Sequence, residues 1–173
     1  MPVIEQVINE DRLTFTFPAG AMATKYDDWA HYRRQFNSAF GGTKAIDLLY
    51  AEDPVGWLVE IKDYRLHVRT KPTDIADEVA HKVRDTLAGL VSAQHHATDT
   101  DERRFARKML RCQRLRVVLH LEQPRKTSRL RPRAIDPAAV QIRLRGLLKA
   151  IDPHVCVVDQ HALKAEMNWT VIG

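Results

Sequence analysis

The chain has 173 residues, of which 45% are hydrophobic, and a formal net charge of +5. This length suits one buried core, so we expect a single domain over residues 1–173. No apolar run is long enough to span a bilayer, and the first residues lack the pattern of a secretory signal. The sequence therefore predicts a cytoplasmic protein without a membrane partner.

Positive charge is concentrated in the second half of the chain. From Arg103 to Lys149 there are 15 lysine and arginine residues against two acidic ones, whereas residues 1–102 carry a net charge of −6. A basic segment joined to an acidic one favours contact with a nucleic-acid backbone beside a place that gathers carboxylates. A solvated basic face on an ordinary domain explains the same charges, so charge alone leaves both interpretations open.

The hydrophobic pattern predicts a mixture of strands and helices. Residues 3–8 and 13–17 indicate an N-terminal β-hairpin, and large apolar residues at three- and four-residue steps predict a helix over 25–38, capped by Asp27. Strands at 45–50 and 56–62 follow, then helices at 75–94 and 101–110 and a buried strand at 115–121. A helix from Asp136 to Ile151 and strands at 155–158 and 169–172 complete a mixed α/β fold.

Charged side chains share one face of the predicted strand at 56–62. Side chains alternate along a strand, so Glu60 and Lys62 point to the same side. Asp47 lies on the preceding strand, and pairing of the two strands brings its carboxylate near Glu60. Two adjacent carboxylates repel each other unless a cation neutralises them, and oxygen ligands of this kind suit Mg²⁺ or Mn²⁺. A bound ion would activate water for phosphodiester hydrolysis, with the Lys62 ammonium beside it.

In this order of elements the residues resemble the PD-(D/E)xK nuclease superfamily, over roughly Asp27 to Leu121. The resemblance implies a restriction-endonuclease-like core, in which helices flank a mixed central sheet, and Mg²⁺-dependent cleavage of DNA. It implies that Asp47 and Glu60 bind the metal and that Lys62 lies beside the attacking water. The acidic residue of the preceding helix matches Asp27 or Asp28, and we take Asp28 as an added metal contact. Ile46 departs from the motif, whose name has proline at this position.

A second group of candidates lies in the predicted loop after residue 121. Its five basic residues are expected to clamp nucleic-acid phosphates rather than read base edges, because they lie on a loop and not on a helix. They are Arg125, Lys126, Arg129, Arg131 and Arg133.

Three functional hypotheses follow from these residues. The first is a Mg²⁺-dependent endonuclease, a hydrolase that cuts DNA in repair, recombination or defence against foreign DNA. The second is a non-catalytic nucleic-acid-binding or scaffold protein that retains the nuclease-like fold. The third is an interaction domain whose basic segment meets an acidic protein. No separate specificity domain is visible, so a protein partner that supplies specificity is compatible with the sequence, as is a homodimer that places two sites on two strands.

Overall fold

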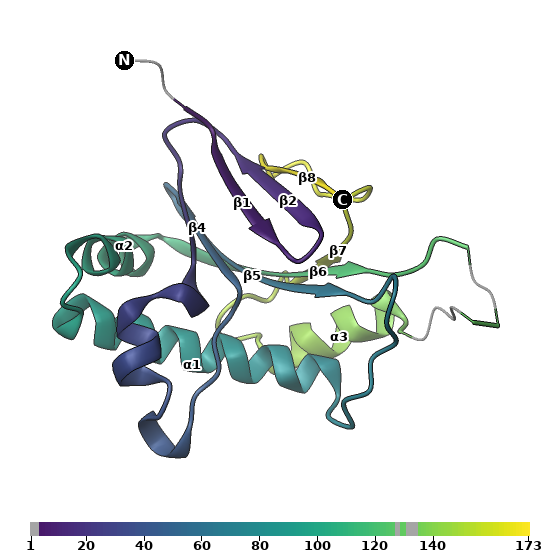
Figure 1. Ribbon diagram of the computed structural model, residues 1–173, viewed down its shortest axis with the longest axis horizontal. Coiled ribbons are helices and arrows are strands. Elements are labelled where there is room, and N and C mark those ends of the chain that lie inside the picture. Colours follow the sequence, from purple (N-terminus) through teal and green to yellow (C-terminus); the bar gives the residue numbers. More distant parts are fainter. Residues whose placement is uncertain (1–3, 127–128, 131–134) are drawn as a thin grey trace.

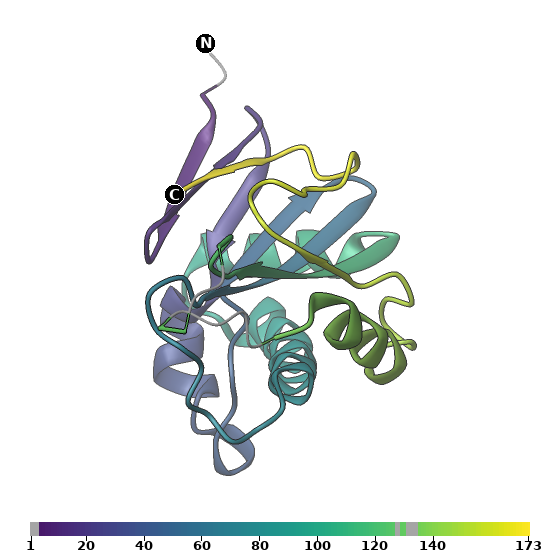
Figure 2. The ribbon, with the colours of Figure 1, turned by 90° about the vertical axis from the view of Figure 1, so that its right-hand side faces the viewer.

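The computed structural model describes residues 4–126, 129–130 and 135–173. Within these residues two β-sheets pack against each other, and the helices cover the opposite face of the larger sheet (Figures 1 and 2). The larger sheet has the strand order β3-β4-β5-β6-β7, and the smaller has the order β1-β2-β8. The strands are β1 (Gln6–Glu10), β2 (Leu13–Phe17), β3 (Met22–Lys25), β4 (Leu48–Glu52), β5 (Val55–Asp63), β6 (Arg114–Glu122), β7 (Cys156–Val158) and β8 (Thr170–Ile172).

Each of the three α-helices found within the described residues begins at an aspartate whose side chain accepts hydrogen bonds from backbone N–H groups of the first turn. The helices are α1 (Ile75–His96), α2 (Thr100–Arg111) and α3 (Pro137–Leu147), with Asp74, Asp99 and Asp136 as their respective caps. Such a cap satisfies donors that have no partner inside the helix and stabilises it by about 1 kcal/mol. The predicted starts of these helices are confirmed to within one residue.

The alternation of side chains along β4 and β5 divides the interior into two cores. Leu49 and Leu58 point toward the helices, whereas Tyr50 and Trp57 pack against the smaller sheet. The sequence predicts that Glu60 and Lys62 share one face of β5, opposite Val59 and Ile61. The structure confirms this, because Val59 and Ile61 belong to the core under the smaller sheet. Glu60 and Lys62 consequently face the helical layer, where α1 lies above them.

Strands β5 and β6 pair in parallel over their whole length, from Val55 opposite Arg114 to Asp63 opposite Glu122. Their carboxyl ends therefore lie at the same edge of the sheet. The segment that enters α1 and the loop that follows β6 both leave from this edge (Figure 1). Glu60 and Lys62, near the end of β5, lie close to it.

The mixed α/β class and the N-terminal hairpin are confirmed, but the predicted helix over residues 25–38 is wrong. The segment contains a 3₁₀ turn (Tyr26–Asp28) and a π-helical turn (Tyr32–Phe36), and another 3₁₀ turn (Ala39–Gly41) follows it. Trp29 has extended backbone angles, and the Glu102 carboxylate of α2 accepts hydrogen bonds from the backbone N–H groups of Ala30 and His31. A continuous helix cannot pass through Trp29, because the Glu102 carboxylate caps a new helical turn that begins after it.

Two further boundaries differ from the sequence-based expectation. The helix predicted to reach Ile151 ends at Leu147, and the short strand β3 was not predicted. The division into domains and the resemblance to a restriction-endonuclease-like core stay predictions. Within the part of the chain that the structure describes, no helix is both long and apolar enough to cross a membrane.

Candidate functional site

The three residues of the predicted motif come together between β5 and α1. Asp47 immediately precedes β4, and its Oδ2 atom accepts a hydrogen bond from the backbone N–H of Ile61 at 2.7 Å. The segment before Asp47 is held by α1, because Thr86 accepts a hydrogen bond from the Ile46 N–H at 3.0 Å. On β5 the Lys62 ammonium lies 2.6 Å from Glu60 Oε1. These contacts hold Asp47 near Glu60, as the sequence predicts.

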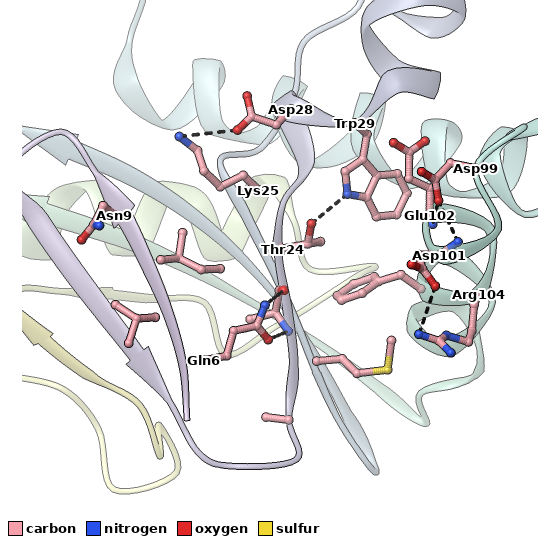
Figure 3. A pocket seen from close by; sticks show the side chains of 16 residues that line it. Gln6, Asn9, Thr24, Lys25, Asp28, Trp29, Asp99, Asp101, Glu102 and Arg104 are labelled. Carbon is pink, nitrogen blue, oxygen red and sulfur yellow. Dashed lines mark hydrogen bonds and ion pairs between the residues drawn. The ribbon is translucent and has the colours of Figure 1, made fainter. Parts of the chain in front are cut away.

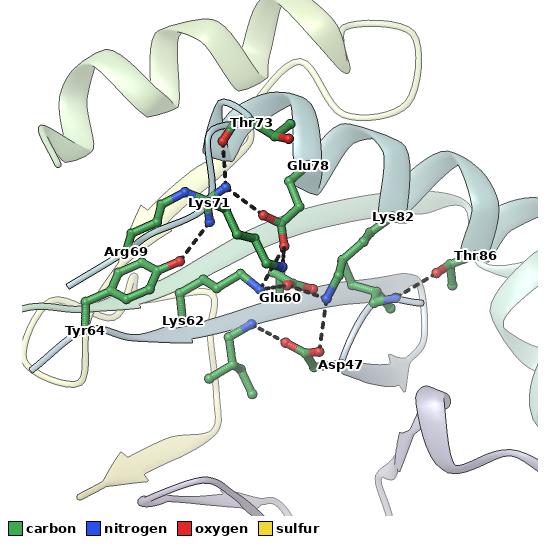
Figure 4. Close-up of polar contacts among 12 residues, drawn as sticks. Asp47, Glu60, Lys62, Tyr64, Arg69, Lys71, Thr73, Glu78, Lys82 and Thr86 are labelled. Carbon is green, nitrogen blue, oxygen red and sulfur yellow. Dashed lines mark hydrogen bonds and ion pairs between the residues drawn. The ribbon is translucent and has the colours of Figure 1, made fainter. Parts of the chain in front are cut away.

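Helix α1 adds a second lysine to the cluster, and the sequence analysis missed it. The Lys82 ammonium lies 2.6 Å from Glu60 Oε1 and 3.4 Å from Asp47 Oδ1, so it bridges the two carboxylates (Figure 4). Glu60 is completely buried, whereas the side chains of Lys82 and Asp47 are about 15% exposed. A signal for Lys82 existed, since it falls at helical spacing from Glu78 on the face that carries Val79 and Val83.

Glu78 forms the other end of the cluster. Its Oε1 atom lies 3.3 Å from the Lys62 ammonium and 3.0 Å from Lys71, and its Oε2 atom lies 2.7 Å from the Arg69 guanidinium. Arg69 also donates to the Thr73 carbonyl at 2.7 Å. Glu78 therefore ties the segment between β5 and α1 to the helix, and this part of the cluster stabilises a loop.

The two glutamates of the cluster, Glu60 and Glu78, have opposite pKa shifts. Burial, and secondarily the nearby Asp47 charge, raises the pKa of Glu60 to about 7, although Lys82 and Lys62 oppose the shift. Burial also acts to raise the pKa of Glu78, but hydrogen bonds from Arg69 and Lys71 and the charge of Lys62 lower it to about 2. Glu60 Oε2 has no hydrogen-bond partner among the described residues. A buried carboxylate oxygen without a donor is poorly stabilised when charged, which agrees with burial as the main cause of the raised pKa of Glu60.

The residues present do not fit the expected Mg²⁺ or Mn²⁺ site. The Lys82 ammonium holds one oxygen of each carboxylate, and the second oxygen of Asp47 is taken by the Ile61 N–H. Asp28 is half exposed and pairs with Arg33 instead of facing Glu60. Among the described residues, no group of three or more histidine, cysteine, aspartate or glutamate side chains has an arrangement suited to a metal ion.

Asp28 lies at a hollow of about 710 Å³ between β1, β3 and the start of α2 (Figure 3), and neither Asp47 nor Glu60 is among the described residues that line it. We expected Asp28 beside the predicted metal site because we predicted a continuous helix over residues 25–38. Such a helix would orient the Asp28 side chain differently. Lys25 and Arg104 lie in this hollow together with four acidic residues, Asp28, Asp99, Asp101 and Glu102. Since carboxylates outnumber cations there, its electrostatics disfavour a phosphate group.

The predicted phosphate-binding residues lie in the loop after β6. Arg125, Lys126 and Arg129 are exposed. Arg131 and Arg133 fall outside the described residues. No ion pair links the three described side chains to a carboxylate in the described part of the chain. Their charges therefore face solvent at the edge where β5 and β6 end.

Comparison with known proteins gives one informative relative. The chain is 35% identical over 161 residues to cysteine–tRNA ligase of Neisseria meningitidis serogroup A. The match covers 76% of this chain but 23% of the ligase, so the chain corresponds to less than a quarter of that protein. No family model matches the chain, and no solved structure matches it.

This relative contradicts the predicted Mg²⁺-dependent DNA endonuclease. The relative is a ligase rather than a hydrolase, and its name specifies tRNA rather than DNA. The Asp and Glu-x-Lys motif misled the prediction because three common residue types on neighbouring strands also form an ion-pair cluster. The structure brings Asp47, Glu60 and Lys62 together, but the nuclease function and the DNA partner inferred from them are wrong.

Proposed function

We propose that this chain is an RNA-binding domain that acts with an aminoacyl-tRNA ligase and that its ligand is tRNA. The observation that carries the proposal is the 35% identity to cysteine–tRNA ligase over 161 residues. More than three-quarters of that ligase lies outside the match, so the role assigned to this chain is binding rather than the whole ligation reaction.

The charge distribution supports an RNA ligand. Lysine and arginine side chains that contact phosphates release condensed counterions from the nucleic acid, and this release supplies most of the sequence-independent affinity. Arg125, Lys126 and Arg129 are exposed, and exposed arginine and lysine side chains commonly donate to phosphate oxygens. Exposed arginine and lysine in a loop position a backbone without reading its sequence.

The Glu60 cluster supports the fold of this surface rather than chemistry. Its lysines are bound to carboxylates, and its contacts join β5, α1 and the segment between them. The backbone N–H of Tyr64, just after β5, donates to the Glu122 carbonyl at the end of β6 at 2.8 Å. The cluster thus fixes the edge of the sheet from which the basic loop leaves.

The test is tRNA binding by the purified chain, measured by fluorescence anisotropy over a series of salt concentrations. The variant Arg125→Gln, Lys126→Gln, Arg129→Gln removes the three described loop charges. A matched control, Arg34→Gln, Lys44→Gln, Lys164→Gln, removes three exposed charges from other parts of the surface. We expect the loop variant to bind roughly tenfold more weakly, with the slope of log K against log salt reduced by about 0.7 for each phosphate that the variant no longer neutralises.

The control variant should bind tRNA as the natural sequence does. A DNA duplex of similar charge serves as the competing ligand, and tRNA should displace it. No binding of tRNA by the natural sequence, or equal losses in the loop and control variants, would overturn the proposal.

A further inference from the structure

The exposed face of α2 carries a row of arginines that none of the contacts described so far uses. Arg104, Arg107 and Arg111 are exposed at steps of three and four residues and so lie along one side of the helix. The opposite side, with Phe105, Ala106 and Met109, is buried in the core. Arg114, exposed at the start of β6, extends the row beyond the helix end.

Carboxylates of the described residues neutralise one member of this row and a neighbouring lysine, but not the other three members. Lys108 pairs with Asp53, and Arg104 lies 3.2 Å from Asp101. For Arg107, Arg111 and Arg114 no ion pair is found within the described residues. Like charges four residues apart on a helix repel each other and destabilise it. A polyanion lying along the row would remove this repulsion between Arg107 and Arg111.

The row ends beside a hollow of about 550 Å³ between the end of α2, the start of β6 and the segment before β7. Arg114 lies on its wall, together with Arg116 and His154. The Arg116 guanidinium is held by Asp152 and Glu166 and lies over the Trp57 ring, so its position is fixed. The volume lies within the range of pockets that hold small ligands, which leaves room for one unpaired nucleotide at the end of the row.

The row and the basic loop lie at opposite ends of β6, because α2 precedes this strand and the loop follows it (Figure 1). Strand β6 has nine residues, and at about 3.3 Å per residue its ends are roughly 26 Å apart. Two surfaces at this separation can contact one RNA only if it extends along the molecule. An RNA shorter than this separation reaches only one of the two surfaces.

We propose that Arg107, Arg111 and Arg114 form a second phosphate-binding surface, which contacts a part of the RNA distant from the part held by the loop after β6. This inference rests on the proposed RNA-binding function. It adds that the ligand is an extended, folded RNA that spans both ends of β6. Charge complementarity selects RNA as the occupant, because the three arginines that have no ion pair within the described residues can each neutralise a phosphate of a polyanion.

The test uses the full chain and the variant Arg107→Gln, Arg111→Gln, Arg114→Gln. Glutamine keeps high helix propensity in α2, and circular dichroism checks the fold of each variant. Binding is measured to a whole tRNA transcript and to a short hairpin cut from it. For the whole tRNA we expect a roughly tenfold loss of affinity and a salt slope lower by about 2, at about 0.7 for each of the three arginines replaced.

For the short hairpin we expect a smaller loss, since it spans one surface. The charge-conserving variant Arg107→Lys, Arg111→Lys, Arg114→Lys should retain most of the affinity for whole tRNA. An α2 variant that binds whole tRNA like the natural sequence, while the loop variant is weakened, overturns the second surface and leaves the proposed function intact. Absence of tRNA binding by the natural sequence overturns the proposed function itself, so the two failures are distinguishable.

Discussion

The Lys82 ammonium lies 2.6 Å from the buried carboxylate of Glu60, at the place where the sequence motif led us to expect a divalent ion. Two lysines share one oxygen of this carboxylate, since Lys62 also lies 2.6 Å from Oε1. A buried charge is tolerated only when it is paired, and removal of one partner leaves the other uncompensated. The ion pairs of Glu60 with Lys62 and Lys82 are therefore expected to determine the stability of the sheet where β5 ends.

Replacement of Lys82 by methionine should lower the free energy of unfolding by about 2 kcal/mol, because Glu60 then keeps one counter-charge and Asp47 loses its bridge. The measurement is urea denaturation followed by circular dichroism. Arg84→Met on the same helix is the matched control, since the Arg84 side chain is 69% exposed, and it should change stability by less than about 0.5 kcal/mol. In a Glu60→Gln background the Lys82→Met loss should shrink, and equal losses in both backgrounds would contradict the pairing.

How far the sequence predicts this site can be followed residue by residue. The parity of Glu60 and Lys62 follows from the alternation of β5, and Asp47 is near them because β4 and β5 pair as neighbours. Lys82 was missed because a lysine on an amphipathic helix normally points to solvent. Helical spacing places Lys82 on the buried face of α1, but its partner Glu60 lies about 20 residues earlier in the chain, and periodicity along the helix does not identify that partner.

The failure at Asp28 has a different cause. Apolar residues at helical spacing predicted one continuous helix, but the turns there are set by the Glu102 carboxylate, more than 70 residues away. The four-residue strand β3 was missed because its pairing with β4 is a tertiary contact, whereas the strand predicted at 169–172 is found as β8. Element types with strong periodicity were therefore predictable, while contacts between distant segments were not.

The stability of the protein should depend on pH through Glu60. Its pKa is raised from 4.5 to about 7 in the folded protein, so between these values the folded state binds more protons than the unfolded state. Its contribution is fully present below pH 4.5 and is lost as the pH rises through 7, on the order of 3 kcal/mol in total. Urea denaturation at intervals between about pH 4.5 and 8 measures the slope. Glu60→Gln should flatten the curve in this window, and an unchanged slope would contradict the assignment.

Glu78 should give the opposite dependence at lower pH. Its pKa is lowered from 4.5 to about 2, so the unfolded state binds more protons between these values. The contribution of Glu78 is present above pH 4.5 and is lost as the pH falls toward 2. Glu78→Gln should also loosen the segment that Arg69 and Lys71 hold. Hydrogen exchange at neutral pH should become faster over residues 65–73, whereas Asp77→Asn, which removes an exposed contact to Arg143, should leave it unchanged.

Gly89 should resist replacement although it lies inside α1, where alanine normally stabilises a helix by about 1 kcal/mol. A Cβ atom at this position would collide with the Tyr26 hydroxyl and approach the Phe36 ring to 3.1 Å. Tyr26 is fully buried, so it has little room to move, and Gly89→Ala should lower the free energy of unfolding by about 1–3 kcal/mol.

The matched control for this replacement is Gly146→Ala in α3, where a Cβ atom meets nothing within 4 Å. This change should stabilise the protein by about 0.5 kcal/mol. Thermal denaturation of both variants distinguishes packing from helix propensity, because propensity alone predicts the same sign at both positions. Adding Tyr26→Phe to Gly89→Ala removes the hydroxyl that the new methyl group meets, and it should recover part of the loss. Stabilisation by Gly89→Ala alone would show that Tyr26 does not set the approach of α1 to the segment before β4.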